Sequence, residues 1–210
     1  IPVNQVAKRC LAELERVELP FVMGATRHIS LLLRGQQRIG VVGPNGCGKS
    51  TLLRVLAGQI EPLSGTCKVT SKSVYLDQRL ANLEPDKTVL EQLQLANRST
   101  TEGELRMLLA QLGLDAQKIT TPSGLLSGGE RLKGALACLL YADSPPKLLL
   151  LDEPNNHLDL PSAQALETLL RSYQGALVVV SHDDAFLGNL ALTDHLIATE
   201  QGWHLEPQSS

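Results

Sequence analysis

The sequence predicts an α/β fold in which a mostly parallel central sheet has helices on both of its faces. The short segments 147–151 and 177–180 are apolar on both strand faces, as central strands of a parallel sheet are when helices cover both sides. Between them, residues 161–173 have Pro161 in the first turn and predict a helix. A strand, a helix and a strand in this order predict a parallel crossover unit.

Further elements extend this pattern along the chain. Short apolar runs flanked by Gly, Pro or polar residues predict strands at 29–33, 38–43, 74–76, 148–151, 177–181 and 196–199. Residues 88–114 have leucines at helical spacing and predict a helical insertion, which we place at about 86–142. Ser127, with Glu130 three residues later, predicts the start of a further helix. We expect residues 1–12 to be the end of a linker and residues 13–210 to form the domain.

Composition and charge limit the classes of function. A chain of 210 residues with 43% hydrophobic content can bury the core of one domain, and its net charge of -3 lacks the basic excess typical of sequence-independent nucleic-acid binding. No apolar run approaches the roughly 18 residues of a membrane-spanning helix, so we expect no direct membrane insertion. The four cysteines lack CxxC spacing and no signal peptide is visible, which predicts reduced thiols and a cytoplasmic location. Because the chain starts at Ile1 rather than Met, we expect it to be part of a longer protein.

Residues 43–51 read GPNGCGKST and match the phosphate-binding pattern G-x-x-x-x-G-K-[ST] between a predicted strand and a predicted helix. Glycines let backbone N–H groups approach phosphate oxygens, and the helix N-terminus adds partial positive charge. Lys49 is expected to contact the β- and γ-phosphates, Ser50 to bind Mg²⁺ and Thr51 to contact the α-phosphate. Cys47 could be a redox-sensitive thiol, but we interpret it as a small residue in a tight loop. The predicted phosphate-binding residues are Gly43, Pro44, Asn45, Gly46, Cys47, Gly48, Lys49, Ser50 and Thr51.

Polar side chains follow three predicted strands at the carboxyl edge of the sheet, where sheets of this kind bind ligands. Asp152 and Glu153 follow the strand at 148–151, and we expect Asp152 to hold Mg²⁺ through water and Glu153 to deprotonate the attacking water. His182 follows the strand at 177–181 and could hydrogen-bond the γ-phosphate. Gln78 follows the strand at 74–76 and could contact Mg²⁺ or the water. Taken alone, a single His or Gln in such a place is usually structural.

Residues 126–130 read LSGGE and add a second phosphate-binding turn at the start of a helix. Together with the loop at 43–51, Gln78, the DEP segment at 152–154 and His182, this order of motifs resembles the ATP-binding cassette family over essentially the whole chain. The resemblance implies a P-loop NTPase fold of the cassette type, with an N-terminal antiparallel β subdomain and a helical insertion, and it implies ATP and Mg²⁺ as ligands. It also implies that two cassettes pack head to tail, so that Ser127, Gly128 and Gly129 act on the ATP of a second cassette and an isolated copy has little ATPase activity.

Within that family, the segments EPNNHLDL at 153–160 and SHDDAFL at 181–187 are most similar to the F subfamily of soluble tandem-cassette proteins, many of which act on ribosomes. The resemblance implies an ATP-driven switch with a partner such as the ribosome, and the lack of an arm insertion fits the second cassette of a pair. Asn155, Asp184 and Ala185 depart from the subfamily pattern. The nucleotide-binding subunit of a membrane transporter is the alternative. Phe21 is the best candidate for the family's adenine-stacking aromatic residue, but its spacing to the phosphate loop is short and we expect it to be a packing residue.

Overall fold

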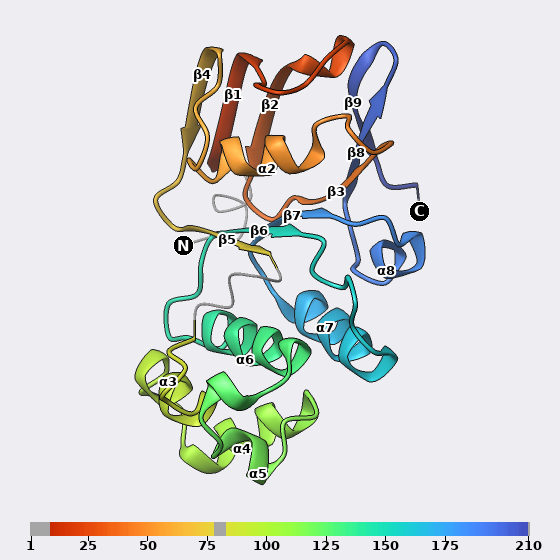
Figure 1. Ribbon diagram of the computed structural model, residues 1–210. Coiled ribbons are helices and arrows are strands. Elements are labelled where there is room, and N and C mark those ends of the chain that lie inside the picture. Colours follow the sequence, from red (N-terminus) through yellow and green to blue (C-terminus); the bar gives the residue numbers. More distant parts are fainter. Residues whose placement is uncertain (1–8, 78–82, 210) are drawn as a thin grey trace. The chain divides into compact units, whose positions relative to one another are not determined.

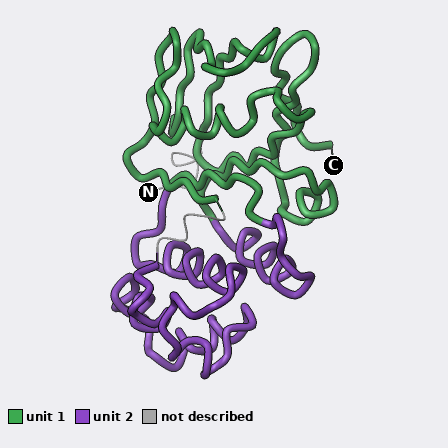
Figure 2. Tube along the Cα trace, in the orientation of Figure 1, with its two compact units in different colours: residues 1–77, 147–154, 174–210 green, residues 78–146, 155–173 purple. Residues whose placement is uncertain are grey.

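The computed structural model describes residues 9–77 and 83–209 (Figure 1). The chain forms two compact units, which Figure 2 shows in different colours. Unit 1 consists of residues 1–77, 147–154 and 174–210, and unit 2 consists of residues 78–146 and 155–173. The second unit therefore extends beyond the helical insertion predicted at about 86–142, because it also takes in the segment after the DEP motif.

A six-stranded sheet forms the centre of unit 1, and its order is β5-β6-β7-β3-β8-β9 (Figure 1). Neighbouring strands from β5 to β8 are parallel, and β9 pairs antiparallel with β8. The predicted mostly parallel sheet is thus confirmed, and β6 and β7 are buried at every position. In sheet order, the strands are β5 (Ser73–Asp77), β6 (Leu148–Asp152), β7 (Ala176–Val180), β3 (Arg38–Val42), β8 (Asp194–Thr199) and β9 (Gly202–Pro207).

A second, antiparallel sheet of unit 1 has the order β2-β1-β4, with β2 at His28–Arg34, β1 at Cys10–Glu18 and β4 at Ser64–Val69. This confirms the predicted N-terminal antiparallel subdomain. The predicted boundary between residues 12 and 13 is too late, because Cys10 already pairs with Arg34 in the sheet. Register shifts along β1 break the alternation of buried and exposed residues that marks a strand in a sequence.

Helix α2 (Lys49–Leu56) packs on the parallel sheet within the core of unit 1. Its buried Leu52 and Leu53 share one apolar cluster with Ile39 of β3 and with Leu14 of the antiparallel sheet. The short helix α8 (Asp184–Gly188) lies at the other face of β3, because a Cβ on Gly40 would lie 3.6 Å from Leu187 Cδ2. A short 3-10 helix, η1 (Ala25–Arg27), precedes β2.

Unit 2 is helical, and side chains cap its helices, among them the predicted Ser127. Thr88, Thr101, Asp115, Ser127 and Asp159 each accept a hydrogen bond from a backbone N–H in the first turn that follows. No helix in the described part of the chain is both long and apolar enough to cross a membrane. The helices are α3 (Val89–Ala96), α4 (Glu102–Gln111), α5 (Ala116–Ile119), η2 (Ser123–Leu125), α6 (Gly128–Leu140) and α7 (Leu160–Ser172).

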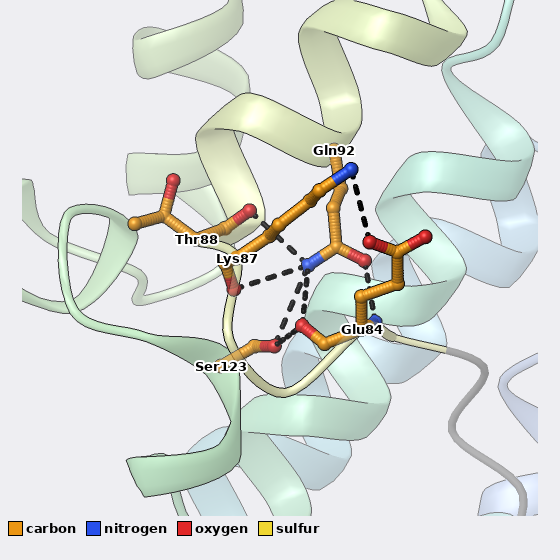
Figure 3. A network of polar contacts seen from close by, with 5 residues as sticks. All are labelled: Glu84, Lys87, Thr88, Gln92 and Ser123. Carbon is orange, nitrogen blue, oxygen red and sulfur yellow. Dashed lines mark hydrogen bonds and ion pairs between the residues drawn. The ribbon is translucent and has the colours of Figure 1, made fainter.

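A polar network centred on Gln92 of α3 fixes two loops of unit 2 to each other (Figure 3). The Gln92 Oε1 accepts from the N–H of Glu84 at 2.8 Å, and its Nε2 donates to the carbonyls of Glu84, Lys87 and Thr88 at 3.2 Å each. The same Nε2 lies 3.4 Å from Ser123 Oγ, which itself donates to the Glu84 carbonyl at 2.7 Å. The turn at 84–88 is therefore tied to η2, the turn that precedes the LSGGE motif.

Candidate functional site

The phosphate loop of unit 1 turns tightly between β3 and α2. Gly48, the residue before α2, has φ 105°, and a Cβ there would lie 2.8 Å from Val22 Cγ2. A Cβ on Gly43 would lie 2.7 Å from the Cβ of Ala198. Glycine is required at both positions, since a side chain would collide with packed neighbours or strain the backbone. Cys47 is buried within this turn, as its interpretation as a small loop residue predicts.

A cavity of about 260 Å³ opens beside the loop and is lined by six of the nine predicted loop residues, together with Glu153 and His182. Lys49, at the start of α2, is buried, and its ammonium donates to the carbonyl of Gly43 at 2.5 Å. The Nζ also lies 3.5 Å from the carbonyl of Pro44. The Lys49 ammonium is thereby fixed to the backbone of the loop that would bind the phosphates. The wall of the cavity includes Phe21, Asn45, Gly46, Gly48, Lys49, Ser50, Thr51, Glu153 and His182.

Asp152, the last residue of β6, is buried and hydrogen-bonded at both carboxylate oxygens. Ser50 Oγ donates to its Oδ1 at 3.2 Å, and the phenol of Tyr75 donates to its Oδ2 at 3.3 Å. Ser50 and Asp152 are separated by 102 positions in the chain but meet at the carboxyl edge of the sheet. A hydroxyl and a carboxylate with several waters are a ligand set that suits Mg²⁺, so these two residues fit the predicted metal.

Glu153 directly follows β6 in a left-handed backbone conformation with φ 49°. Such a conformation is rare outside glycine and is a form of strain found at functional sites. The N–H of Glu153 donates to the Val180 carbonyl at 2.8 Å, which fixes the residue to β7. Its Oε1 is 3.1 Å from His182 Nε2 but accepts no hydrogen bond among the described residues. Burial raises the pKa of the Glu153 carboxyl, against the opposing effect of the His182 charge. A buried carboxylate oxygen that accepts no hydrogen bond can accept one from a water molecule, as a general base must.

The LSGGE motif lies in unit 2, where it opens α6. Ser127 Oγ accepts from the N–H of Glu130 at 3.2 Å, and Glu130 Oε1 accepts from the N–H of Ser127 at 2.9 Å. This is the reciprocal capping box that the spacing of the two residues predicts. A separate cavity of about 510 Å³ extends from this helix start to the segment after the DEP motif, including Asn156 and His157. The two motifs predicted to bind phosphate thus belong to different units and line different cavities.

A comparison with protein families shows to which family the chain belongs. A family model described as ABC transporter matches residues 26–156. The chain belongs to the ATP-binding cassette family. As a member of that family, the cassette is an ATP-binding domain with a P-loop NTPase fold.

Curated relatives of the cassette support its predicted resemblance to the F subfamily. The ATP-binding protein Uup of Haemophilus influenzae is 41% identical over 171 residues, which are 79% of this chain and 26% of the relative. Uup of Escherichia coli K12 is 42% identical over 164 residues, with 75% and 25% covered. The ABC transporter F family member 5 of Arabidopsis thaliana is 37% identical over 177 residues, with 82% and 25% covered. The chain therefore spans about a quarter of the length of these relatives.

Solved structures agree with the cassette fold. A bacterial Atm1-family ABC exporter with ATP bound matches with a TM-score of 0.72 at 18% identity, covering 96% of this chain and 40% of the exporter chain. A metal-chelate type ABC transporter in an inward-facing conformation matches with a TM-score of 0.71 at 22% identity, covering 95% and 84%. At these identities, the likeness concerns the fold alone.

Two site predictions for the cassette have different outcomes in the structure. The expectation that Phe21 is a packing residue is wrong, because its side chain is 89% exposed at the wall of the phosphate-loop cavity. Phe21 has a φ of 63°, which turns the backbone sharply. The apolar character of the segment therefore did not predict whether this side chain is buried. Gln78, predicted to contact Mg²⁺ or the water, lies outside the described residues.

Sequence reasoning missed two residues that lie beside the predicted motifs. Tyr75 donates to Asp152, yet only its place on a strand was visible in the sequence. Lys133 is buried in α6 and lines the cavity at the LSGGE motif. Its position four residues after Gly129 on one helix was the available signal, since residues at that spacing lie on the same face.

Proposed function

We propose that the cassette hydrolyses Mg-ATP, with the phosphate loop and Glu153 supplying one half of each site and a second cassette supplying the other half. The observation that carries this proposal is the common cavity of Lys49, Ser50 and Glu153, in which the Glu153 Oε1 is buried and accepts no hydrogen bond from residues 9–77 or 83–209. The arrangement combines a cation for phosphate oxygens with a carboxylate for a water molecule. These are the parts that phosphoryl transfer to water requires.

Different residues of unit 1 bind the phosphates, the Mg²⁺ and the base of the nucleotide. The loop N–H groups and Lys49 bind phosphate oxygens, and Thr51 contacts the α-phosphate. Ser50 and Asp152 would hold Mg²⁺, which would neutralise charge on the phosphate oxygens. Phe21 is free to stack on the base, because its ring is exposed at the same cavity.

Glu153 is the general base of the proposed reaction. Its carboxylate takes a proton from water while the water oxygen attacks the γ-phosphorus, the bond from that phosphorus to the β–γ bridging oxygen breaks, and ADP leaves. His182 Nε2 lies 3.1 Å from the carboxylate, where its charge favours the ionised form of the base, and the imidazole can contact the γ-phosphate. The strained backbone at Glu153 supports this role, since it fixes the carboxylate at the sheet edge.

The proposed physiological role is that of a cytoplasmic F-type switch, in which ATP draws two cassettes together to act on a partner such as the ribosome. Two features support it: the similarity to the F family member of Arabidopsis, and the NHLD and SHD segments that predicted this subfamily from the sequence. The Ser127 and Gly129 positions of one cassette would then face the ATP of the other.

The substitution Glu153→Gln tests both parts of the proposal. We expect this variant to bind ATP as the parent does and to trap ATP-bound cassette pairs. Its rate of hydrolysis should fall at least about a hundredfold, which corresponds to roughly 3 kcal/mol of lost transition-state stabilisation. Glu206→Gln is the matched control, because Glu206 is exposed on β9. Measurements are phosphate release, nucleotide binding, and co-sedimentation of the trapped pair with ribosomes. Hydrolysis at the parental rate would refute the assignment of the base, and absence from the ribosome pellet would refute the proposed partner.

A further inference from the structure

Three basic residues of unit 1 lie at the amino edge of the parallel sheet, the edge opposite Asp152 and Glu153. They are Arg9, Lys72 and Lys147, which together we call the amino-edge patch. Lys72 directly precedes β5, Lys147 directly precedes β6, and Arg9 directly precedes β1 of the antiparallel sheet. These residues are distant in sequence, so strand pairing brings them together.

Lys72 and Lys147 are neighbours because their strands are paired in parallel. Ser73 and Leu148, the first residues of β5 and β6, are in register. The N–H of Lys147 also donates to the Lys72 carbonyl at 2.8 Å, which extends the contact beyond the strand starts. Neighbouring strands of a sheet are about 5 Å apart. The sheet therefore places two lysines next to each other.

Arg9 reaches the same place through the antiparallel sheet. Strand β1 pairs with β4, and the N–H of Thr70, directly after β4, donates to the carbonyl of Leu11 in β1 at 2.8 Å. Arg9 and Lys72 follow two residues further along these two segments, at the same end of the sheet. Lys72 is thus close to Arg9 through one sheet and to Lys147 through the other.

The positive charges of the amino-edge patch are not balanced by carboxylates. Within residues 9–77 and 83–209, none of the three side chains forms an ion pair. The charge of Arg9, burial, and the charge of Lys72 all lower the pKa of Lys147, as expected where three cations lie close together. Like charges on adjacent strands are destabilising. A bound anion would relieve this repulsion.

The surroundings of the amino-edge patch favour one kind of anion. Arg9 and Lys72 are exposed and Lys147 is partly exposed, so a large ligand can reach them. The chain has a net charge of -3, which makes the patch a local feature. Among the described residues, no exposed large apolar side chain is adjacent in sequence to its members, whereas membrane-binding surfaces combine basic and apolar side chains. Several unpaired cations without apolar neighbours suit a chain of phosphates.

We propose that the amino-edge patch binds the phosphate backbone of RNA. This inference rests on the proposed function for its partner, the ribosome, and assigns to unit 1 a surface that contacts ribosomal RNA. Arg9, Lys72 and Lys147 each pair with phosphate oxygens, so binding depends on salt and not on base sequence. ATP at the phosphate loop leaves the patch accessible, because the loop lies at the carboxyl edge of the sheet.

Fluorescence anisotropy of a fluorescein-labelled oligouridylate, titrated with the chain in the absence of nucleotide, tests the patch directly. Three phosphate contacts predict a slope of about -2 for the logarithm of affinity against the logarithm of salt concentration. We expect the double variant Lys72→Gln/Lys147→Gln to bind about tenfold more weakly at low salt, with a slope of about -0.7. Lys72→Arg/Lys147→Arg keeps both charges and should retain the parental affinity.

Lys68→Gln/Lys87→Gln is the matched control, because it removes the same charge from lysines that face carboxylates. Lys68 lies opposite Glu13 in the β1–β4 pairing, and Lys87 pairs with Glu84 at 3.0 Å. This control should bind RNA as the parent does, and ATP binding checks that every variant is folded. Equal losses in the control and the patch variant would overturn the proposal. A parental chain that binds phosphatidylserine vesicles but not oligouridylate would also overturn it.

A second arm separates the patch from the proposed function. In the Glu153→Gln background, Lys72→Gln/Lys147→Gln should lower the share of protein that sediments with ribosomes about fivefold, with ATP binding unchanged. Unchanged sedimentation would overturn the contact with ribosomal RNA. A parental chain that binds oligouridylate through the patch but neither hydrolyses ATP nor sediments with ribosomes would contradict the proposed function, while the anisotropy result would still support RNA binding by the patch.

Discussion

At Glu153, burial controls protonation and therefore the pH at which the proposed base can act. Loss of hydration raises the pKa of this carboxyl, and the nearby charges of His182 and Lys49 oppose the rise without cancelling it. The base must be ionised to accept a proton. Lowering the pH through the raised pKa therefore removes activity at a pH where an exposed carboxylate, with a pKa of about 4.3, would still be ionised.

We expect the acid limb of the ATPase profile to lie above the ordinary range of a glutamic acid. The measurement is kcat between about pH 4.5 and 8 at saturating ATP. The same shift has a consequence for stability: ionised Glu153 destabilises the fold above its raised pKa, and protonation relieves this as the pH falls. Glu153→Gln should accordingly unfold at the same or a higher urea concentration at neutral pH. An acid limb near the ordinary carboxyl value would show that burial does not govern this group.

Tyr75 provides a second test at the scale of single residues. Its phenol donates to Asp152 Oδ2, so it orients the carboxylate that we assign to Mg²⁺. We expect Tyr75→Phe to weaken the apparent Mg²⁺ affinity in the presence of ATP about fivefold, equivalent to about 1 kcal/mol for one hydrogen bond. Nucleotide binding without metal should not change. The measurement is a Mg²⁺ titration with a fluorescent ATP analogue.

Tyr173→Phe is the control for that experiment. It also removes a phenol that donates a hydrogen bond, but its acceptor is the carbonyl of Pro146 in unit 2, at 2.6 Å. If both variants lowered the Mg²⁺ affinity equally, the effect would reflect general destabilisation and Tyr75 would not be a positioning residue.

Among the elements, α3 depends on a polar network rather than on its apolar face alone. Gln92 holds the 84–88 turn and contacts Ser123 of η2, so five hydrogen bonds involve one side chain (Figure 3). We expect Gln92→Ala to lower the free energy of unfolding by about 1–2 kcal/mol, because the Glu84 N–H loses its acceptor and the carbonyls of Glu84, Lys87 and Thr88 each lose one of their donors. The measurement is urea denaturation of the chain.

Gln94→Ala is a matched control, since it changes the same residue type two positions along α3. Its amide donates to Glu102 Oε1 at 3.1 Å on an exposed surface. The change should cost less than about 0.5 kcal/mol. Equal losses in the two variants would mean that helix propensity, rather than the network, determines the effect.

Some strands of unit 1 could be predicted from sequence patterns and others could not. The strands at 148–151 and 177–181 were predictable because continuous apolar runs bounded by turns mark buried parallel strands. Strands β1, β4 and β9 were not, because bulges in β1 and a mostly exposed β4 and β9 blur the alternation that marks a strand.

Within the site, motif spacing predicted Lys49, Ser50, Asp152 and Glu153. By contrast, the hydrogen bond from Tyr75 to Asp152 depends on the pairing of β5 with β6, which are distant in sequence. Phe21 could not be assigned for a similar reason, since exposure depends on the turn that its backbone makes.

At the scale of the whole molecule, the two motifs that we propose to bind phosphate occur on different compact units of one chain. The phosphate loop belongs to unit 1 and the LSGGE motif to unit 2, and each lines its own cavity. If the motif of one cassette completes the loop of another, hydrolysis requires two chains or two cassettes. The ATPase rate per chain should then rise with chain concentration.

Mixing two inactive variants tests this dependence directly. Lys49→Ala disables the loop and Ser127→Arg disables the motif, so neither chain alone should form an active pair. In a mixture, the loop of the Ser127→Arg chain meets the intact motif of the Lys49→Ala chain, and one of the two sites in each mixed pair is complete. Random pairing in an equal mixture predicts about a quarter of the parental rate per chain.

The measurement is phosphate release at a concentration where the parental chain is active, with ATP binding by Ser127→Arg as the check that this variant is folded. Replacing the Lys49→Ala partner by a chain that carries both substitutions should abolish the recovery, because no intact motif remains. A parental rate per chain that is independent of concentration, together with a mixture as inactive as its components, would mean that each chain completes its own site.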